Sequence, residues 1–235
     1  PYVREHRRTF LTFYGGQAFY AFGFGALTTW LPVVLMRHFD QTAPQVGTAS
    51  GIVYAVSSVV GFGVTVFGFK RLAPYLGDAL PVRMLQLACA TSVVYGVCLL
   101  FSNSATYIYV LSGIAFTFQM AANMTYPTAL QGLAPTPLRA RAAALQGLLA
   151  TPVAAASAPT VGLVSDQLAG VHHGLLIACS AVGIPALLLG LLLFSLAARP
   201  YATTAAAARD ADAAAAREAD AGATTPGGAA APAAA

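Results

Sequence analysis

The stretch PTPLRARAAALQGLLATPVAAASAPTVGLVSD, from Pro135 to Asp166, decides the fold class. It opens with two arginines and then contains no charged residue between Arg141 and Asp166. Two prolines, Pro152 and Pro159, lie inside this apolar run. About 20 apolar residues cross a bilayer, and spanning helices tolerate proline where neighbouring groups satisfy the freed backbone. The stretch therefore predicts a transmembrane helix that keeps its charges at its ends.

The composition of the whole chain also indicates lipid as its solvent. Only 9% of the residues are charged and 57% are hydrophobic, whereas about 25% are charged in an average soluble domain. The net charge of +4 comes from basic residues that sit in short clusters between apolar runs, a pattern typical of membrane topology. We therefore predict a membrane protein that contacts the lipid bilayer and does not bind nucleic acid.

Six apolar runs are long enough to cross a bilayer, and short joins between them imply antiparallel neighbours. We predict an all-α membrane protein whose six-helix bundle occupies residues 1–198. From residue 199 the chain becomes alanine-rich with scattered charges, which predicts a disordered or transiently helical tail over 199–235. The six predicted helices are 10–36, 46–69, 81–101, 106–133, 140–164 and 174–197.

The basic residues are unevenly divided between the two sides that six alternating spans would create. Eleven of the 12 lysines and arginines fall on one side, and only Arg37 falls on the other. Because cytoplasmic loops carry the excess of positive charge, both termini are predicted to face the cytoplasm. The residues on the predicted cytoplasmic side are Arg4, Arg7, Arg8, Lys70, Arg71, Arg83, Arg139, Arg141, Arg199, Arg209 and Arg217.

Uncharged polar residues recur inside the apolar runs, where no ionisable side chain lies deep. Their spacing of three and four residues places them on shared helix faces. Amides are costly against lipid, so these residues are expected either to form interhelical hydrogen bonds or to line a substrate cavity. The aromatic residues beside them favour the cavity. The candidates are Gln17 and Tyr20 in the first run, Gln119, Asn123 and Tyr126 in the fourth, and Gln146 in the fifth.

Motifs for catalysis and for metal binding are missing from the sequence. It contains no Walker loop, no GxSxG and no HExxH pattern, which are signatures of nucleotide, hydrolase and zinc-protease sites. Cys89, Cys98 and Cys179 lie inside apolar runs without metal or disulfide spacing. We therefore expect no enzyme activity, no cofactor and no bound metal. If the protein uses protons, their carrier is expected either in a missing upstream part or at a helix end such as Asp40 or Asp166.

Two segments resemble the major facilitator superfamily of transporters. TTWLPVVLMRHFDQTAPQVG (28–47) resembles the first helix and the following loop of the C-terminal half in bacterial spinster-like members. PLRARAAALQGLLATPVAAASAPTVGLVSD (137–166) resembles the fifth helix of the same half. The charged cytoplasmic motif of the family is only loosely matched by GFKRLAPYLGD (68–78). The resemblance covers residues 4–198.

This resemblance implies half of a twelve-helix fold, in which the first, second, fourth and fifth helices of each half line a cavity. It implies secondary active transport of a small organic solute by alternating access in the inner (plasma) membrane, with a proton or sodium ion as the coupling ion. The chain begins without Met, and we expect it to be a C-terminal fragment whose partner is the missing N-terminal half. The implied cavity residues are Gln17, Tyr20, Gln119, Asn123, Tyr126 and Gln146, and the implied gating residues are Lys70, Arg71 and Asp78.

Two other interpretations remain open at this stage. The chain would be a self-sufficient six-helix transporter if it works as a dimer. It would instead be a non-transporting membrane scaffold or accessory subunit if its amides are tightly packed and no water-filled cavity exists. The two interpretations differ in the water access of the polar residues. A transporter would expose them to a water-filled cavity, whereas the packed amides of a scaffold would be closed to water.

Overall fold

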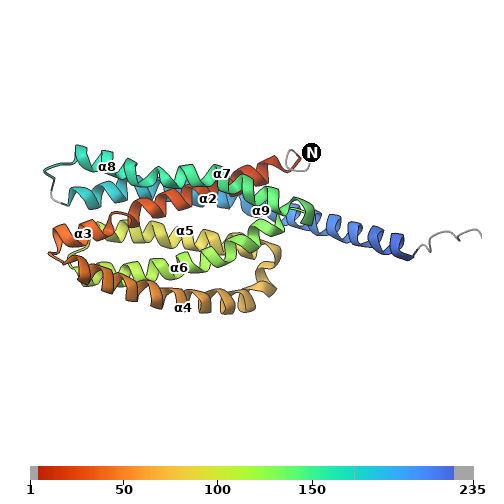
Figure 1. The fold of residues 1–235 in the computed structure, drawn as a ribbon, viewed down its shortest axis with the longest axis horizontal. Helices are drawn as coiled ribbons and strands as arrows, with labels where there is room; N and C mark the ends of the chain where they lie inside the picture. The colour runs from red at the N-terminus through yellow and green to blue at the C-terminus, as the bar shows by residue number, and fades with distance from the viewer. Residues whose placement is uncertain (1–4, 172, 225–235) are drawn as a thin grey trace, which may run out of the picture.

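The fold is an elongated bundle of helices that run roughly along one axis (Figure 1). The computed structural model describes residues 5–171 and 173–224, which form helices and connecting turns without a strand. The predicted all-α class is therefore confirmed. In chain order the elements are α2 (Arg7–Thr28), α3 (Leu31–His38), α4 (Ala43–Leu76), η1 (Gly77–Ala79), α5 (Leu80–Leu99), α6 (Ala105–Gly132), η2 (Thr136–Leu138), α7 (Arg139–Ala155), α8 (Ser157–Gln167) and α9 (Gly174–Thr224).

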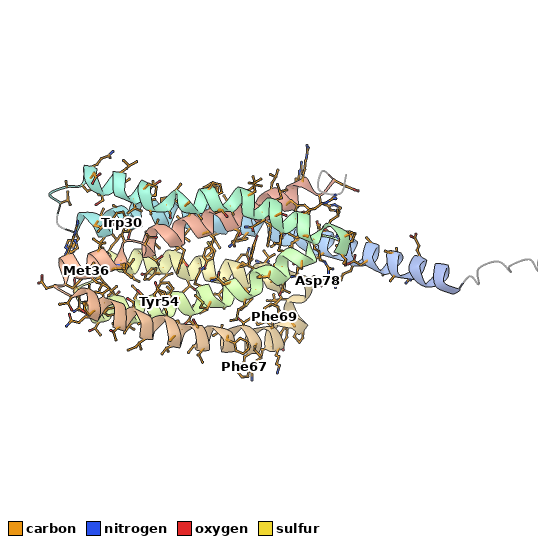
Figure 2. The ribbon with its side chains drawn as sticks, viewed as in Figure 1. Trp30, Met36, Tyr54, Phe67, Phe69 and Asp78 are labelled. Atoms are coloured by element: carbon orange, nitrogen blue, oxygen red, sulfur yellow. The ribbon has the colours of Figure 1, made fainter. Side chains whose placement is uncertain are left out.

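The two ends of the bundle are formed by different segments of the chain. The Trp30 end holds α3 and the loop that leads to α4, whereas the Asp78 end holds the turn between α4 and α5 and the loop between α6 and α7 (Figure 1, Figure 2). The basic segments that begin at Arg7 and Arg139 lie at the Asp78 end, and Arg37 lies at the Trp30 end. The basic segments that the sequence assigns to one side of the membrane thus lie at one end of the bundle.

Within the described ranges, five helical stretches are long and apolar enough to cross a membrane. One of them, Ala43–Leu99, contains the second predicted run and all but the last two residues of the third. The chain reverses direction inside this stretch at Gly77–Ala79 (Figure 1). The structure is therefore compatible with a membrane location, as the composition predicts. The other four stretches are Arg7–His38, Ala105–Gly132, Thr136–Gln167 and Gly174–Glu218.

Two of the predicted helices, 10–36 and 140–164, are each broken into two. The first is interrupted at Trp30, and α3 then starts with a proline in its first turn, where the missing N–H is tolerated. The second is interrupted at Ala156, between the two prolines of that run. The indole Nε1 of Trp30 donates a hydrogen bond to the carbonyl oxygen of Ala158 at 3.0 Å. The two breaks therefore lie beside each other and are tied together.

The most extensive helix contact joins α2 to α9 through glycines. A Cβ atom on Gly23 would lie 2.9 Å from the carbonyl oxygen of Gly183, and one on Gly183 would lie 3.0 Å from that of Gly23. Two turns away on both helices, a Cβ on Gly190 would lie 3.2 Å from the carbonyl oxygen of Gly16. Small residues at a helix interface let the backbones approach closely. No larger side chain fits this contact without separating the helices.

Helix α5 completes the same tightly packed region. The thiol of Cys89 donates to the carbonyl oxygen of Leu187 at 3.1 Å, and the hydroxyl of Ser180 donates to the carbonyl oxygen of Gly96 at 2.9 Å. The three cysteines of the chain are free. Helices α2, α5 and α9 therefore form the core against which the other helices are placed.

Helix α4 lies at the edge of the bundle and packs through one narrow face. Ser57 donates to the carbonyl oxygen of Gly113 on α6 at 2.9 Å, and a Cβ on Gly61 would lie 2.6 Å from the carbonyl oxygen of Thr117. Most other large apolar side chains of α4 are exposed, and Phe67 projects away from the bundle (Figure 2). This surface suits lipid or another helix and not water.

The C-terminal segment, predicted to be disordered or transiently helical, is helix in the structure up to Thr224, where α9 ends. Residues 199–224 are therefore helical. Alanine is the strongest helix former, and tertiary contacts fix the segment against the bundle: the hydroxyl of Tyr201 donates to the carbonyl oxygen of Ala129 at 2.9 Å. The prediction considered composition alone and did not include such contacts. Arg4, one of the basic residues assigned to the cytoplasmic side, and residues 225–235 of the predicted tail lie outside the described residues.

Replacing Gly23 with alanine should destabilise the protein, because the added methyl group meets the backbone of α9. Overpacking of this kind costs about 1–3 kcal/mol. The control is Gly63→Ala, where an added Cβ meets no atom within 4 Å; it should be neutral or slightly stabilising, since alanine favours helix over glycine. Thermal unfolding of the purified protein in detergent measures both variants. Equal melting temperatures would contradict a fold that depends on the glycine contact.

Candidate functional site

A row of polar side chains crosses from α2 to α6 near the middle of both helices. Tyr20 is buried, with 1% of its surface exposed, and its hydroxyl donates a hydrogen bond to Oε1 of Gln119. The Nε2 of Gln119 donates in turn to Oδ1 of Asn123 at 3.2 Å. Asn123 is exposed. Three of the predicted candidates are thus joined in one row, which we call the polar row, and it runs from the core to the surface.

Two further candidates, Gln17 and Tyr126, lie one to two turns from the polar row on the same helices. The ring of Tyr126 stacks on Phe13 of α2, with centroids 5.5 Å apart and planes 5° apart. The hydroxyl of Tyr126 and Oε1 of Gln17 are both enclosed, and no described residue forms a hydrogen bond with either atom. Buried polar atoms without a partner are rare. These two atoms therefore mark positions where water or a bound molecule would complete the hydrogen bonding.

Gln146 lies apart from the polar row, on α7. It shares a helix face with Ala142 and Ala150, the two buried residues of α7. This face meets α2, because the hydroxyl of Tyr14 donates to the carbonyl oxygen of Ala142 at 2.9 Å. No described residue forms a hydrogen bond with the Gln146 side chain. The structure does not join Gln146 to the other candidates.

Aromatic rings extend the site from α2 towards α4. Centroids are 6.2 Å apart for Tyr20 and Phe24, 5.4 Å for Phe24 and Phe116, and 4.3 Å for Phe116 and Tyr54. Rings at such separations attract one another beyond simple burial. Phe116 and Tyr54 are not among the site residues predicted from the sequence. Phe116 had a detectable signal, since it precedes Gln119 by one turn, whereas the place of Tyr54 depends on how α4 packs against α6.

The charged residues considered for gating do not lie in one loop. Lys70 and Arg71 lie within α4, which continues beyond the predicted helix end, and neither forms an ion pair with a described residue. Asp78 lies in the turn between α4 and α5 and pairs with Arg209 of α9. Asp78 is set apart from the adjacent Lys70 and Arg71 because α4 is longer than predicted, and its ion pair is formed with Arg209 of α9.

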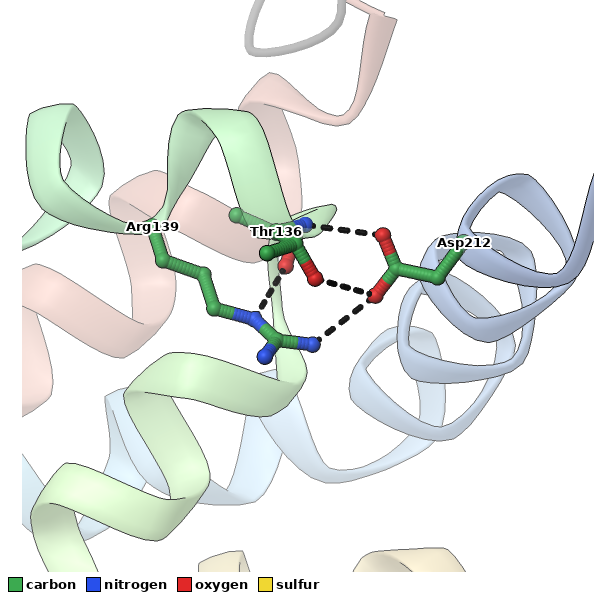
Figure 3. Close-up of polar contacts among 4 residues, drawn as sticks. Thr136, Arg139 and Asp212 are labelled. Carbon is green, nitrogen blue, oxygen red and sulfur yellow. Dashed lines mark hydrogen bonds and ion pairs between the residues drawn. The ribbon is translucent and has the colours of Figure 1, made fainter. Parts of the chain in front are cut away.

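A second ionic contact ties α9 to the loop between α6 and α7 (Figure 3). The carboxylate of Asp212 accepts hydrogen bonds from the backbone N–H of Thr136 at 2.8 Å and from its hydroxyl at 3.0 Å. It also forms an ion pair with Arg139 at 2.9 Å, and Arg139 donates to the carbonyl oxygen of Ala134 at 3.2 Å. We call the contacts of Asp212 with Thr136 and Arg139 the Asp212 clamp. Together with Arg209 and Asp78, it fixes the C-terminal part of α9 to two connecting segments.

The candidate site is equipped for recognition through hydrogen bonds and aromatic contact. The polar row and the aromatic series contain two amides and two tyrosine hydroxyls, and none of their residues is ionisable as an acid or base near neutral pH. Among the described residues, no three His, Cys, Asp or Glu side chains lie close enough together to hold a metal ion. A few convergent polar groups within apolar and aromatic walls are typical of small-molecule sites.

Comparison with known proteins assigns no family to the chain: no family model matches it, and no curated protein matches it as a relative.

Replacing Asp212 with alanine should loosen the C-terminal part of α9, because one carboxylate makes every contact of the clamp. Local opening raises the rate of amide hydrogen exchange, and we expect an increase of about threefold to tenfold across residues 200–212. Asp210→Ala is the matched control, since Asp210 is exposed and has no partner among the described residues. Hydrogen exchange followed by mass spectrometry measures both variants. Unchanged exchange in Asp212→Ala would show that the clamp does not hold the helix.

Replacing Tyr20 with phenylalanine should destabilise the protein by about 0.5–1.5 kcal/mol, because the Gln119 amide loses the hydrogen bond that joins α6 to α2. Tyr75→Phe is the control, since Tyr75 is 85% exposed and no described residue bonds its hydroxyl. Thermal unfolding in detergent compares the two. If the variants melt at the same temperature, the Tyr20 hydroxyl contributes nothing to the packing of α2 on α6.

Proposed function

We propose that this chain is the C-terminal six-helix half of a secondary transporter of the major facilitator superfamily, which moves a small organic solute by alternating access. The observation that supports this most strongly is the polar row. It starts at buried Tyr20 and ends at exposed Asn123, in a bundle whose surface is otherwise largely apolar. An amide is costly against lipid, so the face that carries Asn123 is expected to meet water or solute.

The broken helices support the same function. Discontinuous helices in transporters supply free backbone groups and points of bending near the substrate path. Here α2 and α3 are separated at Trp30, α7 and α8 are separated at Ala156, and the Trp30 hydrogen bond to Ala158 joins the two breaks. A pair of linked breaks would let two helices bend together while the glycine contact between α2 and α9 stays closed.

The charges suggest how the protein lies in the inner membrane. Because the basic segments gather at the Asp78 end, we place that end in the cytoplasm, with both termini on that side. The Trp30 end then faces outward. The polar row has no group that ionises near neutral pH, so a coupling proton or sodium ion would bind in the other half of the proposed transporter or at a helix end of this half, where Asp40 and Asp166 are exposed.

Cysteine labelling in membranes tests this proposal. Cys89, Cys98 and Cys179 are replaced in the full-length gene product, and a single cysteine is introduced at Asn123 or at Ile114. Ile114 is the matched control, because it is also exposed on α6, at 52%, but is apolar and is expected to face lipid. We expect a charged, water-soluble thiol reagent to label Asn123→Cys at least about tenfold faster than Ile114→Cys, because lipid excludes charge.

Labelling from both sides of the membrane separates transport from mere exposure. In alternating access, the charged reagent reaches the same cysteine from the external face of the membrane in right-side-out vesicles and from the cytoplasmic face in inverted vesicles. Labelling from one side only would indicate a fixed crevice. If Asn123→Cys is not labelled in either preparation, the polar row is a packing contact and the scaffold function is favoured instead.

A further inference from the structure

A small cavity lies beside the aromatic series, among α3, α4 and α6. Its volume is about 60 Å³, and Leu31 and Leu35 of α3, Val53 and Tyr54 of α4 and Phe116 of α6 form its apolar walls. Tyr54 projects from α4 next to α6, where its ring contacts Phe116, and 42% of its surface is exposed (Figure 2). Because Phe116 belongs both to this cavity and to the aromatic series, the cavity continues the candidate site towards the Trp30 end.

Hydroxyl groups also line the cavity, and three of them lack partners. Ser112 is paired with Tyr95 of α5 at 3.1 Å. The hydroxyls of Ser50, Tyr54 and Tyr109 form no hydrogen bond with any described residue, and that of Tyr109 is enclosed. Of the three residues, Tyr54 is exposed and Ser50 is partly exposed, so the cost of about 1–3 kcal/mol for an enclosed hydroxyl without a partner applies to Tyr109. A bound group that donates or accepts a hydrogen bond would recover part of that free energy.

The cavity walls carry no charge. None of the residues that line it is Asp, Glu, Lys, Arg or His. A carboxylate, phosphate or ammonium group would lose its hydration there without gaining a counter-ion, which is far more costly than burying a hydroxyl. The walls therefore exclude charged groups and admit neutral polar ones.

The size of the cavity limits what enters it. A single water needs roughly 10–15 Å³ of such space, so about 60 Å³ is enough for a small group. Pockets for whole drug-sized molecules measure roughly 300–1,000 Å³. The cavity thus fits one end of a solute, while the rest of the molecule lies along the aromatic series towards the polar row.

We propose that this cavity binds the uncharged end of the solute, a hydroxyl- or carbonyl-bearing group on a small aromatic or branched aliphatic frame. The inference rests on the proposed function in one respect, since the bound group is taken to be part of the transported solute. Tyr54 and Phe116 contact the frame, and the hydroxyls of Ser50, Tyr54 and Tyr109 select a hydrogen-bonding group over a purely apolar one. Any charged part of the solute is bound outside this cavity.

A cysteine at Ser50 reports on occupancy of the cavity. In the full chain without its native cysteines, Ser50→Cys is alkylated by N-ethylmaleimide in detergent, with and without four probes of similar frame: benzyl alcohol, toluene, benzoate and benzylammonium. We expect benzyl alcohol to slow alkylation at least about threefold, toluene to slow it less, and the two ions to have no effect. Ser58→Cys, two turns along α4 and outside the cavity, should be unaffected by every probe.

A second substitution tests the role of the hydroxyls. Tyr109→Phe in the Ser50→Cys background should reduce protection by benzyl alcohol to the level given by toluene, because the hydrogen-bonding partner is lost. Tyr75→Phe should leave the protection unchanged, since Tyr75 lies on α4 near the Asp78 end and does not line the cavity.

Several results would overturn this inference. These are equal protection by all four probes, stronger protection by benzoate or benzylammonium, full protection in Tyr109→Phe, and a Ser50→Cys that does not react even without a probe.

Failure of this inference and failure of the transport proposal are distinguishable. Labelling of Asn123→Cys from both sides without protection at Ser50→Cys retains transport and removes the inference. Protection without labelling of Asn123→Cys retains a neutral-group site and removes transport.

Discussion

The backbone contact between α2 and α9 at Gly23 and Gly183 is the constraint on which the rest of the bundle depends. Helices in lipid gain little from the hydrophobic effect when they associate, so close packing and hydrogen bonds must hold them together. The same contact fixes Tyr20, whose backbone nitrogen would lie 3.1 Å from a Cβ on Gly190. With its backbone held against α9, Tyr20 directs its hydroxyl towards Gln119 of α6. The polar row therefore starts from the most tightly packed part of the molecule.

The bundle is packed unevenly, and this unevenness bears on function. Helices α2, α5 and α9 share a dense core, whereas α4 and α7 each bury only a narrow face. The candidate site lies where the dense part meets the loosely packed part. A rigid wall that carries polar groups, next to helices that bury few of their own side chains, suits the proposed function, in which one set of helices moves while the other holds the solute.

Charge is confined to the ends of the bundle, where it fastens connecting segments. The Asp212 clamp and the pair between Asp78 and Arg209 attach the C-terminal part of α9 to the segments that join α4 to α5 and α6 to α7. An alanine-rich segment is helical by propensity, but short isolated helices are marginal in water. These contacts hold α9 against the bundle as far as Asp212, and beyond that residue the helix continues on the strong helix propensity of alanine.

The sequence by itself determined the all-α class, the apolar runs and the helix faces that carry polar residues, because hydropathy and a period of 3.6 residues are local properties. It placed Gln119 beside Asn123 for the same reason, since they are one turn apart. Only the tertiary structure brought Tyr20 to Gln119, and Tyr54 to Phe116. These contacts depend on the rotation and the axial offset of each helix against its neighbours. Glycine contacts and interhelical hydrogen bonds between residues far apart in the chain set both quantities, and no local pattern in the sequence records them.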